Sequence, residues 1–215
     1  MNTENTLNRA YAHWIQDGIF EIGLGILLTG VGTLRAIIHF AGEKTAAYYW
    51  LSAGLLVFMI GCGWGFSRIG NSLKARITYP RTGYTAFKPY SFNYKSILAI
   101  LALFIIAGIL GGMLGILSTQ LNQQEIGGIV PIVMGIVGAL AFTYVARRIE
   151  VKRFYYLAAF SIGIGLVIGA LGVGVVLGVS FFYLSIGLAL IVTGSVALVQ
   201  FLRSHEPIDL NSESQ

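Results

Sequence analysis

The chain has 215 residues, of which 56% are hydrophobic and 11% are charged, and its formal net charge is +5. Soluble domains carry about 25% charged residues, so this composition excludes a globule covered by polar surface. The 28 glycines agree, because small residues are frequent in membrane helices, where they let neighbouring backbones approach. The sequence predicts an all-α integral membrane protein whose positive charge faces lipid headgroups, with no nucleic-acid partner.

Six stretches are apolar enough to cross a membrane. A hydrocarbon core about 30 Å thick needs roughly 20 mainly apolar residues per helix. A polar cytoplasmic segment, 1–17, precedes these stretches, and a polar cytoplasmic tail, 203–215, follows them. No cleavage site follows the first apolar run, so we expect the first span to be retained. The predicted spans are 18–40, 47–66, 96–118, 127–146, 155–175 and 180–202.

The last two spans come from one apolar stretch, 154–202, which holds 49 residues and no charged side chain. As a single helix it would be about 74 Å long, more than twice the thickness of the membrane. Glycines at 172, 174 and 178, followed by Ser180, predict a turn at which the chain folds back. The sequence therefore predicts a bundle of six transmembrane helices.

The orientation of this bundle follows from the positions of its basic residues. If the amino terminus is cytoplasmic, only Arg35 and Lys44 of the 14 Lys and Arg residues fall outside. The other 12 fall inside, mostly in the connections 67–95 and 147–153. Cytoplasmic loops carry an excess of Lys and Arg. We therefore expect both termini to be cytoplasmic, in a multi-pass protein of a bacterial inner membrane.

The long connection, 67–95, holds six basic residues, several tyrosines and phenylalanines, and no acid. Near an anionic leaflet each Lys or Arg is worth about 1 kcal/mol, and tyrosine favours the headgroup depth. Proline and glycine in "PRTG" at 80–83 predict a tight turn with Arg81 and Thr82 at its tip. The candidate contacts to an anion, a lipid or a partner are Tyr79, Arg81, Thr82, Tyr84 and Lys88.

Three interpretations of this loop remain open. In the favoured one it is a structural loop that packs on the membrane surface. In the second, Arg81, Thr82 and the N–H groups of the turn bind a phosphate, since a guanidinium beside backbone donors suits that anion. A catalytic role is least favoured, because no carboxylate or histidine of the loop could act as acid or base.

The stretch "KARITYPRTGY" at 74–84 resembles the loop of uncharacterised bacterial multi-pass membrane proteins that carry the pattern R-x-T-Y-P-R-T-G-Y. The resemblance covers about a dozen residues firmly and the spans only in general character. It implies a prokaryotic inner-membrane setting. It implies no activity and no catalytic residue.

Four ionisable residues accompany the first span. Asp17 and Glu21 lie at its cytoplasmic start, and Arg35 and His39 lie near its other end. At about 100° per residue, all four fall within about 40° on one helix face. Such groups are costly in a membrane and often functional, which makes them the candidate intramembrane polar residues. The favoured interpretation of Glu21 itself is that it lies one turn into the span, reaches the interface and contributes little. Apolar residues separate the two pairs, so the first span alone is not expected to conduct a proton or an ion.

Two segments of the chain are similar to each other. "IGLGILLTGVGTL" at 22–34 and "IGLALIVTGSVAL" at 186–198 share six identities in thirteen positions. The two predicted helices run in opposite directions, as an inverted repeat requires. The favoured explanation is nevertheless that two helices rich in Gly and Leu match by composition.

Function is only weakly constrained by these patterns. The favoured hypothesis is a non-enzymatic accessory, scaffold or interaction component whose basic loop contacts anionic headgroups, a membrane-protein partner or a second copy of the chain. The alternative is a small transporter or channel for an uncharged or anionic solute. An enzyme is least favoured, because the span interiors offer no histidine base. No catalytic residue, cofactor or metal site is predicted.

Overall fold

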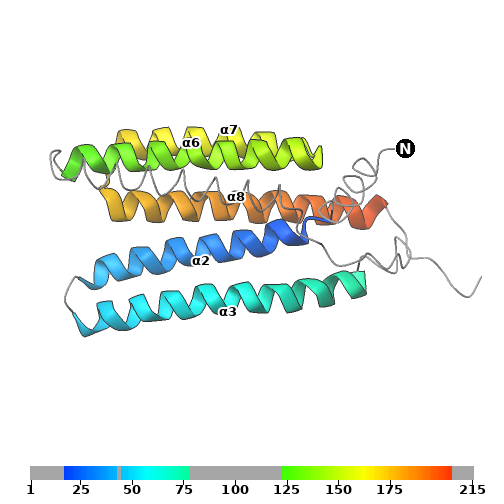
Figure 1. Ribbon diagram of the computed structural model, residues 1–215, viewed down its shortest axis with the longest axis horizontal. Helices are drawn as coiled ribbons and strands as arrows, with labels where there is room; N and C mark the ends of the chain where they lie inside the picture. Colours follow the sequence, from blue (N-terminus) through cyan, green and yellow to red (C-terminus); the bar gives the residue numbers. More distant parts are fainter. Residues whose placement is uncertain (1–16, 43–44, 78–122, 205–215) are drawn as a thin grey trace, which may run out of the picture.

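The computed structural model describes residues 17–42, 45–77 and 123–204. These segments form α-helices and contain no strand, which confirms the all-α class. Four of the helices, α2, α6, α7 and α8, are long and apolar enough to cross a membrane. The predicted span 96–118 lies outside the described residues. The helices are α2 (Ile19–Ala41), α3 (Ala46–Ile77), α6 (Gln123–Ile149), α7 (Arg153–Leu171) and α8 (Val175–Ser204) (Figure 1).

Two predicted connections are shorter than expected because helices continue into them. The first eleven residues of 67–95 belong to α3, which extends to Ile77. This part contains no proline, and Ile69, Leu73 and Ile77 follow one another at the i, i+4 spacing of a helix face. Likewise α6 extends to Ile149 and α7 begins at Arg153. The basic stretch 147–153 therefore lies mostly within helix ends.

The chain folds back between the last two predicted spans, as expected, but the turn is shorter than predicted, because Gly178 and Ser180 lie within α8. Helix α7 ends at Leu171, and Gly172 and Gly174 have φ angles of 59° and 83°. These left-handed values favour glycine, which has no Cβ to clash with the backbone. The turn occupies 172–174, and α8 begins at Val175, five residues before the start expected from the sequence.

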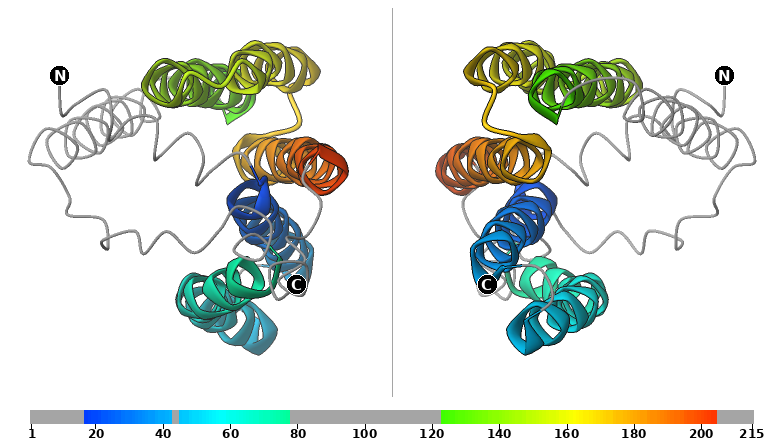
Figure 2. Two further views of the ribbon diagram at one scale, coloured as in Figure 1. Left: turned by 90° about the vertical axis from the view of Figure 1, so that its right-hand side faces the viewer. Right: turned by 90° about the vertical axis from the view of Figure 1, so that its left-hand side faces the viewer.

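The helices lie roughly parallel or antiparallel to one another in an elongated arrangement (Figure 1). The end-on views in Figure 2 place α6 beside α7, with α8, α2 and α3 following in succession below them. The most extensive contacts join α2 to α8 and α6 to α7, and α8 also packs on α6 and α7. Helix α8 therefore connects the α6–α7 pair to the α2–α3 pair.

Helices α2 and α8 are in backbone contact. A Cβ atom added to Gly25 would lie 2.7 Å from the Gly187 carbonyl oxygen, and one added to Gly187 would lie 2.8 Å from that of Gly25. The segments 22–34 and 186–198 are thus antiparallel neighbours. Small residues recur every seventh position along this contact. The facing pairs are Gly18 with Gly194, Gly25 with Gly187, and Gly32 with Ser180.

Helices α6 and α7 are joined in a similar way. A Cβ atom on Gly165 would lie 2.7 Å from the Pro131 carbonyl oxygen, and one on Gly169 would lie 2.7 Å from that of Gly128. The fully buried Ser161 hydroxyl donates to the Gly135 carbonyl at 3.0 Å. Close packing of small residues and hydrogen bonds between helices are what hold helices together in lipid.

Candidate functional site

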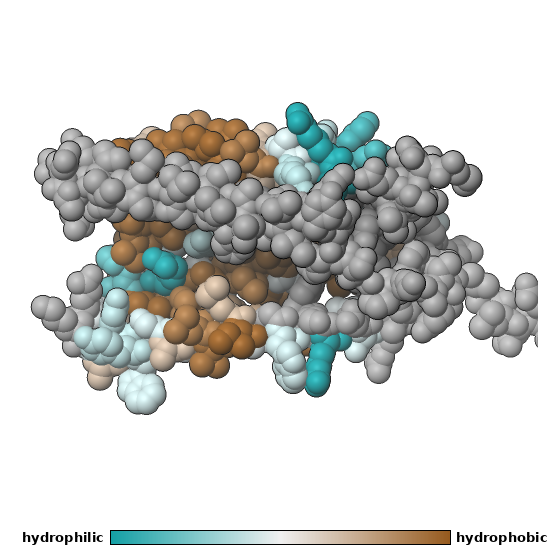
Figure 3. All heavy atoms as spheres, viewed as in Figure 1, coloured by the Kyte–Doolittle hydropathy of each residue, from teal (hydrophilic) through white to brown (hydrophobic). Residues whose placement is uncertain are grey.

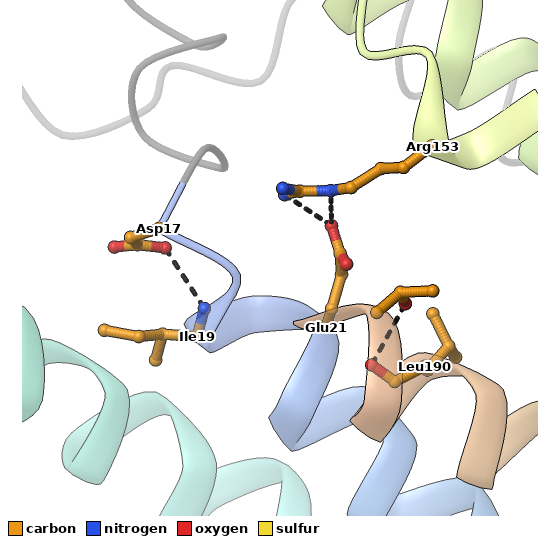
Figure 4. Close-up of polar contacts among 6 residues, drawn as sticks. Asp17, Ile19, Glu21, Arg153 and Leu190 are labelled. Carbon is orange, nitrogen blue, oxygen red and sulfur yellow. Dashed lines mark hydrogen bonds and ion pairs between the residues drawn. The ribbon is translucent and has the colours of Figure 1, made fainter. Parts of the chain in front are cut away.

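A buried ion pair lies where α2 and α7 begin, beside Thr193 and Gly194 of α8. The Arg153 Nε donates to Glu21 Oε1 at 2.7 Å, and Arg153 Nη2 lies 2.6 Å from the same oxygen. The Glu21 side chain is 1% exposed and that of Arg153 is 22% exposed. Figure 4 shows the guanidinium reaching from α7 over the start of α2. The pair therefore joins elements 132 positions apart in the sequence.

The surrounding backbone explains how a glutamate fits here. Glu21 lies in the first turn of α2, where the helix dipole favours negative charge. On α8, Gly194 leaves room for it, since a Cβ atom on Gly194 would lie 2.9 Å from the Glu21 Cβ. Arg153 is the first residue of α7, and the short connection 150–152 holds it at this end of the bundle. The backbone packing of α2 on α8 and the short connection before α7 thus fix the positions of both charges within the bundle.

One carboxylate oxygen of Glu21 has spare acceptor capacity. Both Arg153 contacts go to Oε1, and Oε2 has no hydrogen-bond partner in the structure as described. Thr193 lies beside the carboxylate on α8, but its hydroxyl donates to the Leu190 carbonyl at 3.2 Å. The pair is therefore strongly held on one side and open to a further donor on the other.

Asp17 stabilises the start of α2. Its side chain is fully buried, and Oδ1 accepts a hydrogen bond from the Ile19 N–H at 3.2 Å (Figure 4). The first N–H groups of a helix lack partners within the helix; the N-cap residue Gly18 has no side chain to offer, and the Asp17 carboxylate supplies one of these N–H groups with an acceptor. Gly18, with φ 71°, lets the chain turn between the two residues. This contact gives Asp17 a structural role.

The structure does not bring the four candidate polar residues of the first span together. Asp17 and Glu21 are buried at one end of α2, whereas Arg35 is half-buried toward the other end and His39 is exposed. The Arg35 Nε has no hydrogen-bond partner within the described part of the chain. The His39 ring lies 5.7 Å from that of Phe40. The Glu21 side chain is 1% exposed and faces into the bundle, in contrast to the favoured interpretation in which it reaches the interface and contributes little.

The five candidate residues of the long loop lie outside the described residues. The structure instead shows a second charged feature, formed by helix ends. Helices α2 and α7 begin, and α3, α6 and α8 end, at the same end of the bundle (Figure 1). We call this the cationic end, defined by its exposed basic residues. They are Arg147 in the last turn of α6, Lys152 before α7, Arg203 in the last turn of α8, and Arg68, which lies nine residues before the end of α3.

The cationic end also holds paired and acidic groups. Arg148 donates to the Tyr144 hydroxyl at 2.9 Å, and Glu150 is exposed in the short connection. Figure 3 shows hydrophobic side chains over the middle of α6 and α7 and hydrophilic ones toward the end at which α6 terminates. Arg153, which the sequence counts among the cytoplasmic cations, is neutralised by Glu21.

Arg153 is the member of this candidate site that sequence reasoning missed. It stands among several basic residues in "RRIEVKR" at 147–153, and nothing in that pattern distinguishes it from its neighbours. The available signal was Glu21 itself, since a carboxylate within an apolar span needs a partner. Among the described residues, no group of three His, Cys, Asp or Glu side chains could hold a metal ion.

Comparisons of the chain with protein families, with curated proteins and with solved structures find no match.

Proposed function

We propose that the protein is a non-enzymatic multi-pass membrane component that holds its cationic end against anionic lipid headgroups, as an accessory or scaffold of the membrane. One observation carries the proposal: Arg68, Arg147, Lys152 and Arg203 come from separate parts of the chain and are all exposed at one end. Each such residue near an anionic leaflet is worth about 1 kcal/mol.

The orientation in this proposal follows from the same residues. Placed in the cytoplasm, the cationic end satisfies the rule that Lys and Arg are retained inside. Both termini are then cytoplasmic, as is the loop carrying Tyr79, Arg81, Thr82, Tyr84 and Lys88, which adds further contacts with headgroups or a partner. In this proposal the span 96–118 completes six crossings of a bacterial inner membrane.

Counting bound lipids tests the proposal. The purified protein in detergent is incubated with phosphatidylglycerol or phosphatidylcholine, and retained lipids are counted by native mass spectrometry. We expect more phosphatidylglycerol to be retained, and we expect the preference to shrink as salt is added, because salt screens exposed charges. The triple variant R147Q/K152Q/R203Q should lose most of the preference. Equal retention of the two lipids by the wild-type protein would contradict the proposal.

A second candidate is a small transporter or channel for an uncharged or anionic solute. The observation that favours it is the buried Glu21–Arg153 pair with a free carboxylate oxygen, since ionisable groups within a membrane often mark a pathway. It predicts solute flux in proteoliposomes that falls in Glu21→Gln. Affinity purification from native membranes separates the candidates further: a stoichiometric protein partner favours a scaffold, and a lone homo-oligomer favours transport.

A further inference from the structure

One basic residue of the cationic end differs from the others in its surroundings. The Arg68 guanidinium carbon lies 4.1 Å from the centroid of the Trp64 ring, one helical turn earlier on α3. A cation over an indole face is attracted by the ring quadrupole, and Trp gives the strongest such contact. The ring therefore holds the planar guanidinium in one orientation, with its N–H donors available at the edges.

The depth of this pair along α3 suits a headgroup. Helix α3 is not among the four helices that are apolar enough over a full span, and its apolar stretch is the shorter Ala46–Cys62. In the proposed six-span arrangement this stretch crosses the hydrocarbon core, which is about 30 Å thick and needs roughly 20 residues at 1.5 Å each. Trp64 and Arg68 then lie at the boundary between acyl chains and headgroups, where Trp is enriched in membrane proteins. The Trp64 side chain is 63% exposed, so it faces the surroundings of the bundle.

A shallow hollow adjoins the guanidinium. It has a volume of about 310 Å³ and is lined by Arg68, Ile69, Ser72 and Leu73. These residues form two adjacent rows along α3, because positions four apart lie on one face. One row offers a guanidinium and a hydroxyl, both donors. The other row is apolar and exposed. A ligand that carries an anion beside a hydrocarbon part matches both rows.

We propose that Arg68 and Ser72 bind the phosphate of one anionic phospholipid, with its glycerol and acyl region against Ile69 and Leu73. Arginine suits this role because its fork of donors matches phosphate oxygens bidentately. The proposal rests on the proposed function, in which the cationic end faces headgroups, and names one discrete site within it. The other three basic residues of the cationic end attract anionic lipids collectively, and Arg68 binds one phospholipid molecule. These three residues are Arg147, Lys152 and Arg203.

Fluorescence of Trp64 tests the site directly. In a protein carrying Trp14→Phe and Trp50→Phe, Trp64 is the remaining tryptophan of the three. Phosphatidylglycerol, phosphatidylcholine or inorganic phosphate is titrated into the delipidated protein in detergent. We expect a saturable change with phosphatidylglycerol, and none with inorganic phosphate at the same concentration. Arg68→Ala should raise the titration midpoint about tenfold and Ser72→Ala less, because a charged, bidentate guanidinium binds phosphate more strongly than a neutral hydroxyl does.

Arg203→Ala is the matched control, since it removes another exposed cation from the same end and does not line the hollow. It should change the midpoint less than twofold. Equal midpoints for Arg68→Ala and Arg203→Ala would overturn the discrete site while leaving the general preference for anionic lipid intact. Saturation by inorganic phosphate alone would overturn the assignment to a lipid. If Arg68→Ala unfolds at the same temperature as the wild type, its change in titration midpoint reflects binding. If Arg68→Ala does not fold, Arg68→Lys replaces it. Lysine contacts a phosphate through a single nitrogen, so its midpoint should lie between those of the wild type and a variant without the cation.

Discussion

Arg153, the first residue of α7, donates through Nε to Oε1 of Glu21 in the first turn of α2 and places Nη2 2.6 Å from the same oxygen. The two helices are not among the extensively packed pairs, which are α2 with α8 and α6 with α7. The ion pair is therefore a polar connection between two packed units that otherwise meet through α8.

The two partners should not contribute equally to stability. Removing one member of a buried pair leaves an uncompensated charge and costs about 3–5 kcal/mol. Arg153→Met leaves Glu21, which is 1% exposed, without a partner, so we expect a loss near that range. Glu21→Gln leaves Arg153, which is 22% exposed and can extend toward the headgroups, so we expect a smaller loss. Denaturant unfolding in detergent micelles measures both values.

The double variant Glu21→Gln/Arg153→Met provides the control for this prediction. Because neither charge remains, its stability should exceed that of Arg153→Met alone. Arg203→Met, at an exposed position of α8, should change stability little. Losses that simply add in the double variant would show that the two side chains are not coupled.

Glycine at the α2–α8 contact is required by space. A Cβ atom on Gly187 would lie 2.5 Å from the Thr29 backbone nitrogen and 2.8 Å from the Gly25 carbonyl oxygen. We expect Gly187→Ala to lower stability by about 1–3 kcal/mol, the usual cost of overpacking. Gly163 on α7 has no atom within 4 Å of such a Cβ, so Gly163→Ala should be neutral or stabilise by up to about 1 kcal/mol. Thermal unfolding compares the two, and a shift in the same direction for both would contradict the close contact.

At the α7–α8 turn, glycine is required by conformation. Gly172 has φ 59°, yet a Cβ there would meet nothing within 4 Å. We expect Gly172→Ala to cost about 1 kcal/mol, since a left-handed conformation costs an L-residue roughly 1–2 kcal/mol. Gly172→Asn should cost less, because asparagine tolerates this region, and Gly172→Val should cost more. If the unfolding temperature instead fell steadily with side-chain volume, from Gly172→Ala through Gly172→Asn to Gly172→Val, the cost would be steric and the conformational explanation would be wrong.

Part of this structure could be predicted from the sequence. The α7–α8 turn was predictable, because an apolar run of 49 residues exceeds one crossing and glycines mark where it folds back. The extension of α3 to Ile77 was missed, because hydropathy shows where a span leaves the hydrocarbon and not where its helix ends. Beyond the predicted span 47–66, the residues of α3 up to Ile77 include no proline, so the backbone hydrogen bonds of the helix continue there.

The contacts between helices were harder to predict. Small residues at 18, 25 and 32 and at 180, 187 and 194 are a readable signal for two faces that pack closely, although it does not say which helices pair. The partner of Glu21 could not be predicted, because several basic residues surround Arg153 and only the three-dimensional packing brings one of them to the carboxylate. The segments 22–34 and 186–198 prove to be neighbours, which their similarity alone did not require.

The central claim, that the cationic end faces the cytoplasm, is tested most directly by cysteine labelling. In a Cys62→Ser background, which removes the single cysteine, Lys152→Cys marks the cationic end and Ala46→Cys marks the start of α3 at the opposite end. Both positions are exposed. With a membrane-impermeant maleimide, intact spheroplasts should label position 46 at once and position 152 only after permeabilisation. Labelling of position 152 in intact spheroplasts, with position 46 protected, would contradict the account.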